Sequence, residues 1–194
     1  MKSYLFTSQR LGFRNWRQAD LQPMAALNAD PEVMAYFPGT ASEEETYRFI
    51  ERMQQQYAER GFCYFAVDKL EDGEFIGFIG LSEQNYQAYF TPCTDIGWRL
   101  KKSAWGQGFA TEGAKACLDY TFSRLGLEKV YAVAPLVNTP SENVMKKIGM
   151  QPLKTFMHPL LLQDERLREC MVYMIDKHRY HNAPAPLAER PDVE

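Results

Sequence analysis

The sequence lacks paired cysteines, long apolar runs and an excess of positive charge, and each absence excludes a class of protein. Its four cysteines lie far apart and form no CxxC pair, so we expect reduced thiols. No apolar run reaches the roughly 20 residues that a membrane-spanning helix needs, so no membrane partner is expected. The net charge of −3 argues against nucleic-acid binding through a general basic field.

Histidine is also scarce, and this makes a metal site improbable. The three histidines lie near the C-terminus without the spacing of metal ligands, at His158, His178 and His181. No apolar signal-peptide core follows Met1. Together with the reduced thiols, this predicts a cytoplasmic protein.

What remains is the composition of one globular domain. A chain of 194 residues, 45% apolar and 24% charged, is long enough to bury a sizeable core. We expect residues 1–180 to form this domain, as a monomer or a homodimer. Residues 181–194 are rich in proline and polar side chains, which predicts a disordered tail.

Hydrophobic periodicity predicts helices mixed with strands along the chain. Strand patterns cover residues 11–16, 62–68, 75–82, 95–100, 129–134, 151–157 and 170–176. Helical patterns cover residues 20–28, 30–37, 42–60, 109–124 and 141–147, with Asp20, Ser42 and Ser141 as the expected caps. Helices with a hairpin-rich sheet predict an α+β or mixed α/β domain.

Residues 105–112, WGQGFATE, place two glycines between a predicted strand and a predicted helix. Gly106 and Gly108 let the backbone approach a ligand, and the free N–H groups at the helix start favour an anion such as a pyrophosphate. A role in packing alone is as compatible with the pattern. A P-loop is excluded because G-x-x-x-x-G-K-[ST] is absent. A dinucleotide site is disfavoured, because Thr111 replaces a third small residue and Glu128 precedes the next strand.

A second polar stretch follows the predicted strand 129–134. Residues 138–150 read NTPSENVMKKIGM. One interpretation is a capped helix and nothing more. The other is a set of ligand-binding groups, since open sheets bind ligands beyond the carboxyl ends of their strands.

The two stretches together resemble the GCN5-related N-acetyltransferase (GNAT) family. The family's loop (Q/R)-x-x-G-x-(G/A) matches at Gly108 and Ala110, with Trp105 in the leading position. The form W-G-x-G-x-A-T-E-A is typical of the subgroup of ribosomal-protein N-terminal acetyltransferases. The pattern N-x-x-S-x-x-x-x-x-K-x-G-[FM] matches from Asn138 to Met150.

The resemblance covers about residues 4–178 and implies both a fold and a co-substrate. The fold is a mixed, mostly antiparallel central sheet of about seven strands flanked by helices. The co-substrate is acetyl-CoA, whose acetyl group passes directly to a primary amine. The implied binding residues are Trp98, Arg99, Leu100, Trp105, Gly106, Gln107, Gly108, Phe109, Ala110, Thr111, Asn138 and Ser141.

The residues that move protons are less clearly marked. Many GNAT enzymes carry a tyrosine acid in the helix where this chain has Met145. We expect Ser141 to take that role, unless it is only a helix cap, and Asn138 to hold the pantetheine arm or the thioester. Glu83 and Asp95 flank predicted strands and are the candidates for the base. Each could instead be a solvated charge at a strand end.

The nature of the acceptor follows from the subgroup and from amine chemistry. An α-amine has a pKa of about 8, against about 10.4 for lysine, so it needs only a modest base. The expected acceptor is therefore a protein or peptide N-terminus. Two alternatives stay open, a small-molecule amine as acceptor and a non-catalytic module that only binds acyl-CoA.

Overall fold

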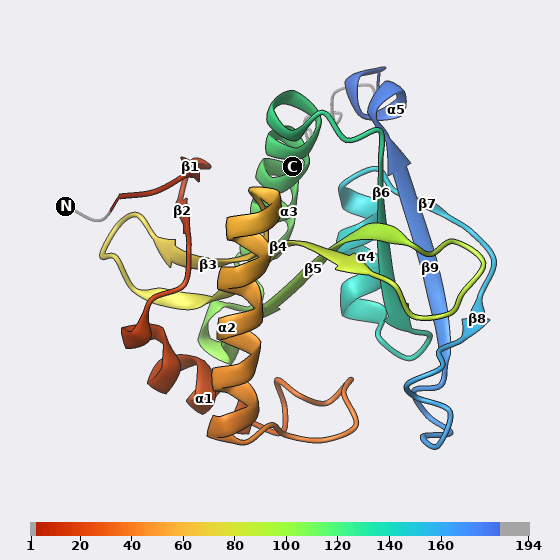
Figure 1. Ribbon diagram of the computed structural model, residues 1–194, viewed down its shortest axis with the longest axis horizontal. Coiled ribbons are helices and arrows are strands. Elements are labelled where there is room, and N and C mark those ends of the chain that lie inside the picture. Colours follow the sequence, from red (N-terminus) through yellow and green to blue (C-terminus); the bar gives the residue numbers. More distant parts are fainter. Residues whose placement is uncertain (1–2, 183–194) are drawn as a thin grey trace, which may run out of the picture.

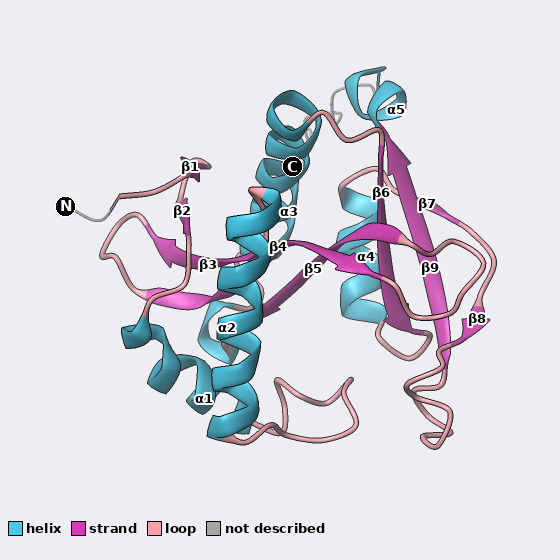
Figure 2. Cartoon of the chain, in the orientation of Figure 1, coloured by secondary structure: helices cyan, strands magenta, loops and turns pink. Residues whose placement is uncertain are grey.

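One sheet organises the fold in the computed structural model, which describes residues 3–182 (Figures 1 and 2). Its order is β1-β2-β3-β4-β5-β6-β9-β7, with β8 also paired to β9. All strand pairs are antiparallel except β5 with β6. The strands are β1 (Phe6–Thr7), β2 (Leu11–Arg14), β3 (Tyr64–Lys69), β4 (Phe75–Gln84), β5 (Cys93–Leu100), β6 (Lys129–Pro135), β7 (Gln151–Pro152), β8 (Phe156–Met157) and β9 (Glu169–Asp176).

The mixed, mostly antiparallel fold with flanking helices is confirmed, but the number of strands differs. The described residues form nine strands instead of about seven. The segment expected as one strand at 151–157 is split into β7 and β8, and β1 was not expected. Each of these three strands has only two residues.

Helices cover both faces of the sheet (Figure 2). Phe78 and Ile79 are successive residues of β4 and therefore point to opposite faces. Phe78 contacts Phe49 of α2 (Glu43–Arg60), whereas Ile79 approaches Gly113 of α3 (Phe109–Tyr120). Helix α1 (Leu21–Ala29) packs with α2, and α4 (Thr139–Lys147) packs with α3. A continuous apolar core fills the space between the helices and the sheet.

Local capping explains the longest helix. The Ser42 hydroxyl accepts a hydrogen bond from the Glu45 N–H, and the Glu45 carboxylate accepts one from the Ser42 N–H, which confirms the expected capping box. Gly61 ends α2 with a φ of 76°, in the left-handed region. Helix α3 continues into a π-helical turn, Thr121–Leu125, and Gly126 ends it.

The helix expected at residues 30–37 is wrong, since this segment forms turns. Asp30 is extended, with a ψ of 114°, as the residue before a proline prefers. Its carboxylate accepts a hydrogen bond from the Glu32 N–H, which stabilises the turn. The segment therefore loops out between α1 and α2.

Two of the expected helix caps are also corrected. Helix α4 is capped by Asn138, whose Oδ1 accepts from the Ser141 N–H at 3.1 Å, and not by Ser141. Both are good cap residues, and Pro140 fits the first turn of the earlier start. Asp20 does stand before α1, but its carboxylate makes no cap bond to that helix.

Asp20 instead belongs to a buried ionic network. Arg14 is 3% exposed and donates to Asp20 at 2.6 and 2.8 Å and to Asp68 at 2.8 Å through each of two nitrogens. All three side chains are buried. The network joins β2 and β3 to the start of α1.

We expect Asp20→Ala to lower the free energy of unfolding by about 3–5 kcal/mol, because it leaves a buried guanidinium half-paired. Urea unfolding measures this. The control is Asp72→Ala, whose partner Lys69 lies at the surface, and its expected cost is below about 1 kcal/mol. An Asp20→Ala cost as small as that of the control would contradict the account.

At the C-terminal end, α5 (Lys177–Asn182) follows β9. Residues 183–194, most of the segment expected as a tail, lie outside the described residues. No helix in the described part of the chain is long and apolar enough to cross a membrane. All four cysteines are free thiols.

Candidate functional site

The two motifs lie at the same end of the sheet. Strands β5 and β6 are parallel, so their carboxyl ends lie at the same end, and the motifs directly follow those ends. The two strands pair only at Asp95 and Tyr131 and then diverge (Figure 1). Residues 97–100 of β5 therefore pair with β4 on one side and with no strand on the other. A free strand edge can pair with the amides of an extended ligand.

The glycine-rich turn has the geometry of an anion cradle. Gly106 and Gly108 have φ values of 72° and 79°. Among residues 3–182, a Cβ at Gly106 would meet nothing within 4 Å, and at Gly108 it would meet only Arg10 Nη2, at 3.6 Å. Helix α3 starts at Phe109, so its first N–H groups have no partners within the helix. Open space, free N–H groups and the positive end of a helix dipole fit a pyrophosphate.

Arg10 holds this turn in place, and sequence reasoning gave it no role. Its Nη2 donates to the Gln107 carbonyl at 3.0 Å and its Nε to Glu112 at 2.7 Å. Its guanidinium also lies 4.4 Å from the centre of the Phe109 ring. Because Arg10 lies about a hundred residues from the loop, nothing local in the sequence marks the contact.

The other predicted loop and strand residues have separate tasks. The Trp105 indole N–H donates to the Leu100 carbonyl at 2.8 Å, which ties the loop back to β5. Gln107 bonds the Ser103 carbonyl at 2.8 Å. Trp98 packs against the core, whereas Arg99 points to the opposite face and bonds Asn28 of α1. Only the backbone of Trp98, Arg99 and Leu100 lies on the strand edge that faces the gap.

At the end of β6, Asn138 and Ser141 are half-buried at the start of α4. The Asn138 Oδ1 is used by the cap, while its amide nitrogen and the Ser141 hydroxyl make no hydrogen bond within the described residues. Met145 is 2% exposed and belongs to the core. The position where many GNAT enzymes have a tyrosine therefore faces the interior here.

Asp95 is a buried carboxyl on β5 that is joined to a tyrosine on β3, across β4. The Tyr64 hydroxyl donates to Asp95 Oδ1 at 2.7 Å, and Gln84 Nε2 donates to the Tyr64 oxygen at 3.4 Å. Burial raises the pKa of Asp95 to about 6, although hydrogen bonds from Tyr64, Gln84 and Ser82 oppose the rise. A group with this pKa is a functional-site candidate on physical grounds.

The sequence analysis did not identify Tyr64, but two glycines in the sequence provide the space for its ring. In the sheet, Tyr64 pairs with Gly80, and Gly80 pairs with Gly97. A Cβ at Gly97 would lie 3.0 Å from the Tyr64 ring. Glycines at matching positions of two adjacent strands therefore allow the ring to cross β4 and reach Asp95.

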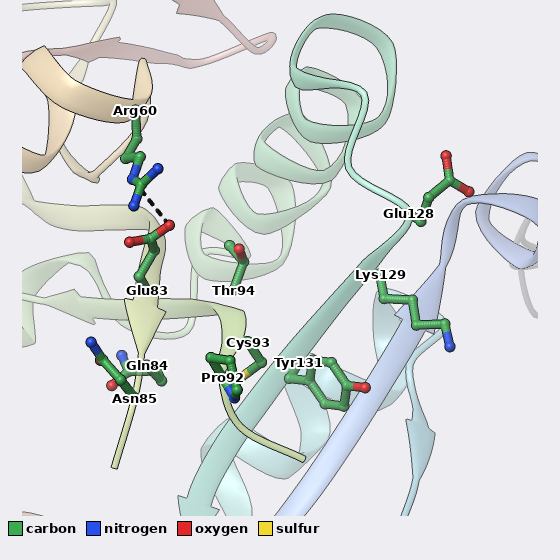
Figure 3. A pocket seen from close by; sticks show the side chains of 10 residues that line it. All are labelled: Arg60, Glu83, Gln84, Asn85, Pro92, Cys93, Thr94, Glu128, Lys129 and Tyr131. Carbon is green, nitrogen blue, oxygen red and sulfur yellow. Dashed lines mark ion pairs between the residues drawn. The ribbon is translucent and has the colours of Figure 1, made fainter.

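Glu83, the other candidate base, lies on β4 opposite Thr94, the residue before Asp95. It is exposed and forms an ion pair with Arg60 at 3.2 Å. Both line a hollow of about 610 Å³ at the end of the sheet where β5 and β6 begin (Figure 3). The other wall of the hollow carries Glu128 and Lys129. This is the end opposite the glycine-rich turn, so the structure does not bring Glu83 to the predicted cofactor residues.

A glycine-rich cradle beside a free strand edge fits an extended ligand that bears a pyrophosphate, as coenzyme A does. The family model described as "Acetyltransferase (GNAT) domain" matches residues 10–151. The chain belongs to this family. It is an acyltransferase that uses acetyl-CoA as its co-substrate.

Relatives and solved structures agree with this assignment. An uncharacterised N-acetyltransferase of Bacillus subtilis is 33% identical over 147 residues, 75% of this chain and 81% of the relative. The spermidine N(1)-acetyltransferase of Escherichia coli is 25% identical over 187 residues, 93% of this chain and 95% of its own. The crystal structure of a GNAT-family acetyltransferase from Bacillus anthracis has a TM-score of 0.73 at 26% identity and covers 89% of this chain and 98% of its own.

Two more distant structures share the fold. A spermidine N-acetyltransferase from Vibrio cholerae, in complex with CoA and spermine, has a TM-score of 0.69 at 21% identity and covers 89% of this chain and 98% of its own. A ribosomal L7/L12 alpha-N-protein acetyltransferase, in complex with coenzyme A, has a TM-score of 0.70 at 17% identity, with 90% and 98% covered. At these identities the likeness concerns the fold alone.

Proposed function

We propose that the protein transfers the acetyl group of acetyl-CoA to an α-amine, the N-terminus of a protein or peptide. The observation that carries this is the Asp95–Tyr64 pair, a buried carboxyl with a pKa of about 6. The amine nitrogen forms the new bond to the acetyl carbon, and the bond from that carbon to sulfur breaks. The proton of the amine passes to the base, and the thiolate of coenzyme A leaves.

A base of this strength suits an α-amine much better than a lysine. With pKa values of about 8 and 10.4, roughly a quarter of α-amines but only about 0.1% of lysines are neutral at pH 7.5. The difference is about 200-fold before any contact is made. A polyamine has primary amines of the lysine kind, so the same disadvantage applies to it.

The carboxyl need not touch the acceptor itself. The Tyr64 hydroxyl, which donates to Asp95, can pass its proton to the carboxylate while it receives one from the amine. Ser141, with its hydroxyl free of partners in the described residues, is the proposed donor to the departing thiolate. Asn138 Nδ2 is the proposed contact to the pantetheine arm or the thioester. Both side chains lie at the start of α4, where Asn138 is the N-cap.

A small-molecule amine is the second candidate. The similarity to a spermidine N(1)-acetyltransferase spans 93% of this chain, which is the observation in its favour.

The pH profile of kcat/KM tests the α-amine proposal. We expect kcat/KM for a peptide with a free N-terminus to rise with pH through two limbs. One lies near 6, where Asp95 ionises to become a base, and one near 8, where the acceptor loses its proton. A profile that keeps rising to pH 10 with every amine would contradict it.

A further inference from the structure

Arg99 lies on the face of β5 that carries Asp95, and its positive charge has few hydrogen-bond partners. Only its Nη1 has a hydrogen-bond partner in the described part of the chain, the Asn28 Oδ1 at 2.6 Å. Its Nε is buried and has no partner there. The guanidinium lies 4.0 Å from the centre of the Phe37 ring and 5.4 Å from that of Phe78.

Arg99 lacks the carboxylate partners that Arg14 has. Arg14 is buried against two carboxylates. Arg99 has no carboxylate within ion-pair distance among residues 3–182, and burial lowers its pKa to about 10. Arg99 is half-buried and its Nε fully buried, a costly place for a cation without an anion, and a guanidinium is shaped for bidentate bonds to a carboxylate. An oxygen anion would satisfy the free edge of this group.

The position of Arg99 connects it with the proposed base. Asp95, Gly97 and Arg99 are every second residue of β5 and therefore lie on the same face of the sheet. The rings of Phe78 and Tyr64, stacked at 5.0 Å, fill the face between Arg99 and the Asp95 carboxyl. Asn28 is itself held by Thr46 at 2.9 Å, so Arg99 is fixed in this orientation. Asp95 and Arg99 are four residues apart on β5, about 13 Å between their Cα atoms, so a molecule that brings its amine to the Tyr64–Asp95 pair reaches Arg99 by extending along this face over the Phe78 ring.

We propose that the acceptor carries a carboxylate close to its amine and that Arg99 binds this carboxylate. The inference rests on the proposed function and narrows its substrate class. It also disfavours a polyamine, because a polycation would meet a fixed positive charge. The carboxylate can come from a free amino acid or from an acidic side chain next to a peptide N-terminus.

Matched acceptor pairs test the proposal and separate the two sources. The first pair is alanine and alaninamide. The second pair is two tripeptide amides that have Asp or Asn at the second position. We expect Arg99→Gln to reduce the preference for the acidic member of a pair by about 10- to 100-fold, the effect of a hydrogen bond to a charged group. The ratio is compared between variants, so differences in amine pKa within a pair cancel.

Arg166→Gln is the matched control. Arg166 bonds the Ala35 carbonyl at 2.6 Å and so supports the same loop as Phe37, but it is exposed. Its variant should keep the wild-type preference, and both variants should bind acetyl-CoA normally in calorimetry. Arg99→Lys, which keeps the charge but loses the planar fork, should keep part of the preference. It also serves if Arg99→Gln fails to fold.

Each outcome decides the matter. Loss of preference in the first pair alone assigns an amino acid, and in the second pair alone an acidic peptide. An unchanged preference in Arg99→Gln overturns the proposal, as does a wild-type protein that favours spermidine. If no amine is acetylated, the proposed function fails. Calorimetry of the acetylated acid and amide with the CoA-bound protein then tests Arg99 on its own, and equal affinities overturn its role.

Discussion

Gly108→Val is expected to weaken acetyl-CoA binding by more than about 100-fold in a protein that still folds. Gly108 has a φ of 79°, which a β-branched side chain adopts only at high cost. A Cβ there points into open space with only Arg10 nearby, so the valine would occupy the room left for the pyrophosphate. The change also misdirects the free N–H groups at the start of α3.

Gly126→Val is the control for backbone strain. Gly126 has a φ of 67° and open space around its Cβ position, but it lies beyond the other end of α3. It should lose stability to a similar degree and keep its affinity. Isothermal titration calorimetry measures the acetyl-CoA affinity of both variants, and urea unfolding measures their stability. Unchanged affinity in a folded Gly108→Val protein would remove the cradle from the account.

Asp95→Asn should lower kcat by about 10²- to 10⁴-fold, the range for loss of a general base, with acetyl-CoA affinity unchanged. The limb of the pH profile near 6 should disappear, since asparagine does not titrate there. The variant should still fold. The pKa of Asp95 is raised in the folded state, so its ionisation above pH 6 destabilises the fold, and the amide removes that penalty.

Glu83→Gln provides the comparison, since Glu83 was the other candidate base. It is exposed and has Arg60 as its partner, whereas Asp95, one register step away in the sheet, is buried. Its kcat should stay within a few-fold of wild type. Steady-state kinetics on both variants decides between the carboxylates, and a large loss in Glu83→Gln with none in Asp95→Asn would reverse the assignment.

Local signals made most of the helices and the glycine-rich turn predictable. The capping box of Ser42 and Glu45 and the glycine stop at Gly61 act over a few residues, so they can be recognised in sequence. The same holds for Gly106 and Gly108, whose positive φ values no other residue adopts easily. Pro31 misled the prediction, because the residue before a proline prefers an extended backbone to the helix expected there.

The chemistry of the site depends on contacts that sequence spacing does not show. Tyr64 and Asp95 are separated by 31 positions and meet because three strands align in one register. Arg10 reaches Gln107 across 97 positions. Asp95 could be named as a candidate from its place at a strand start, but its partner and its raised pKa follow only from the register and the burial.

Release of the coenzyme A thiol, followed with a thiol reagent, tests the central claim most directly. The acceptors are a lysine-free peptide with a free N-terminus, the same peptide N-acetylated with one internal lysine, and spermidine, all at pH 7.5. We expect turnover of the free N-terminus, with the other two at least about 100-fold slower because of their smaller neutral fractions. Robust turnover of the internal lysine or of spermidine, with none of the free N-terminus, would contradict it.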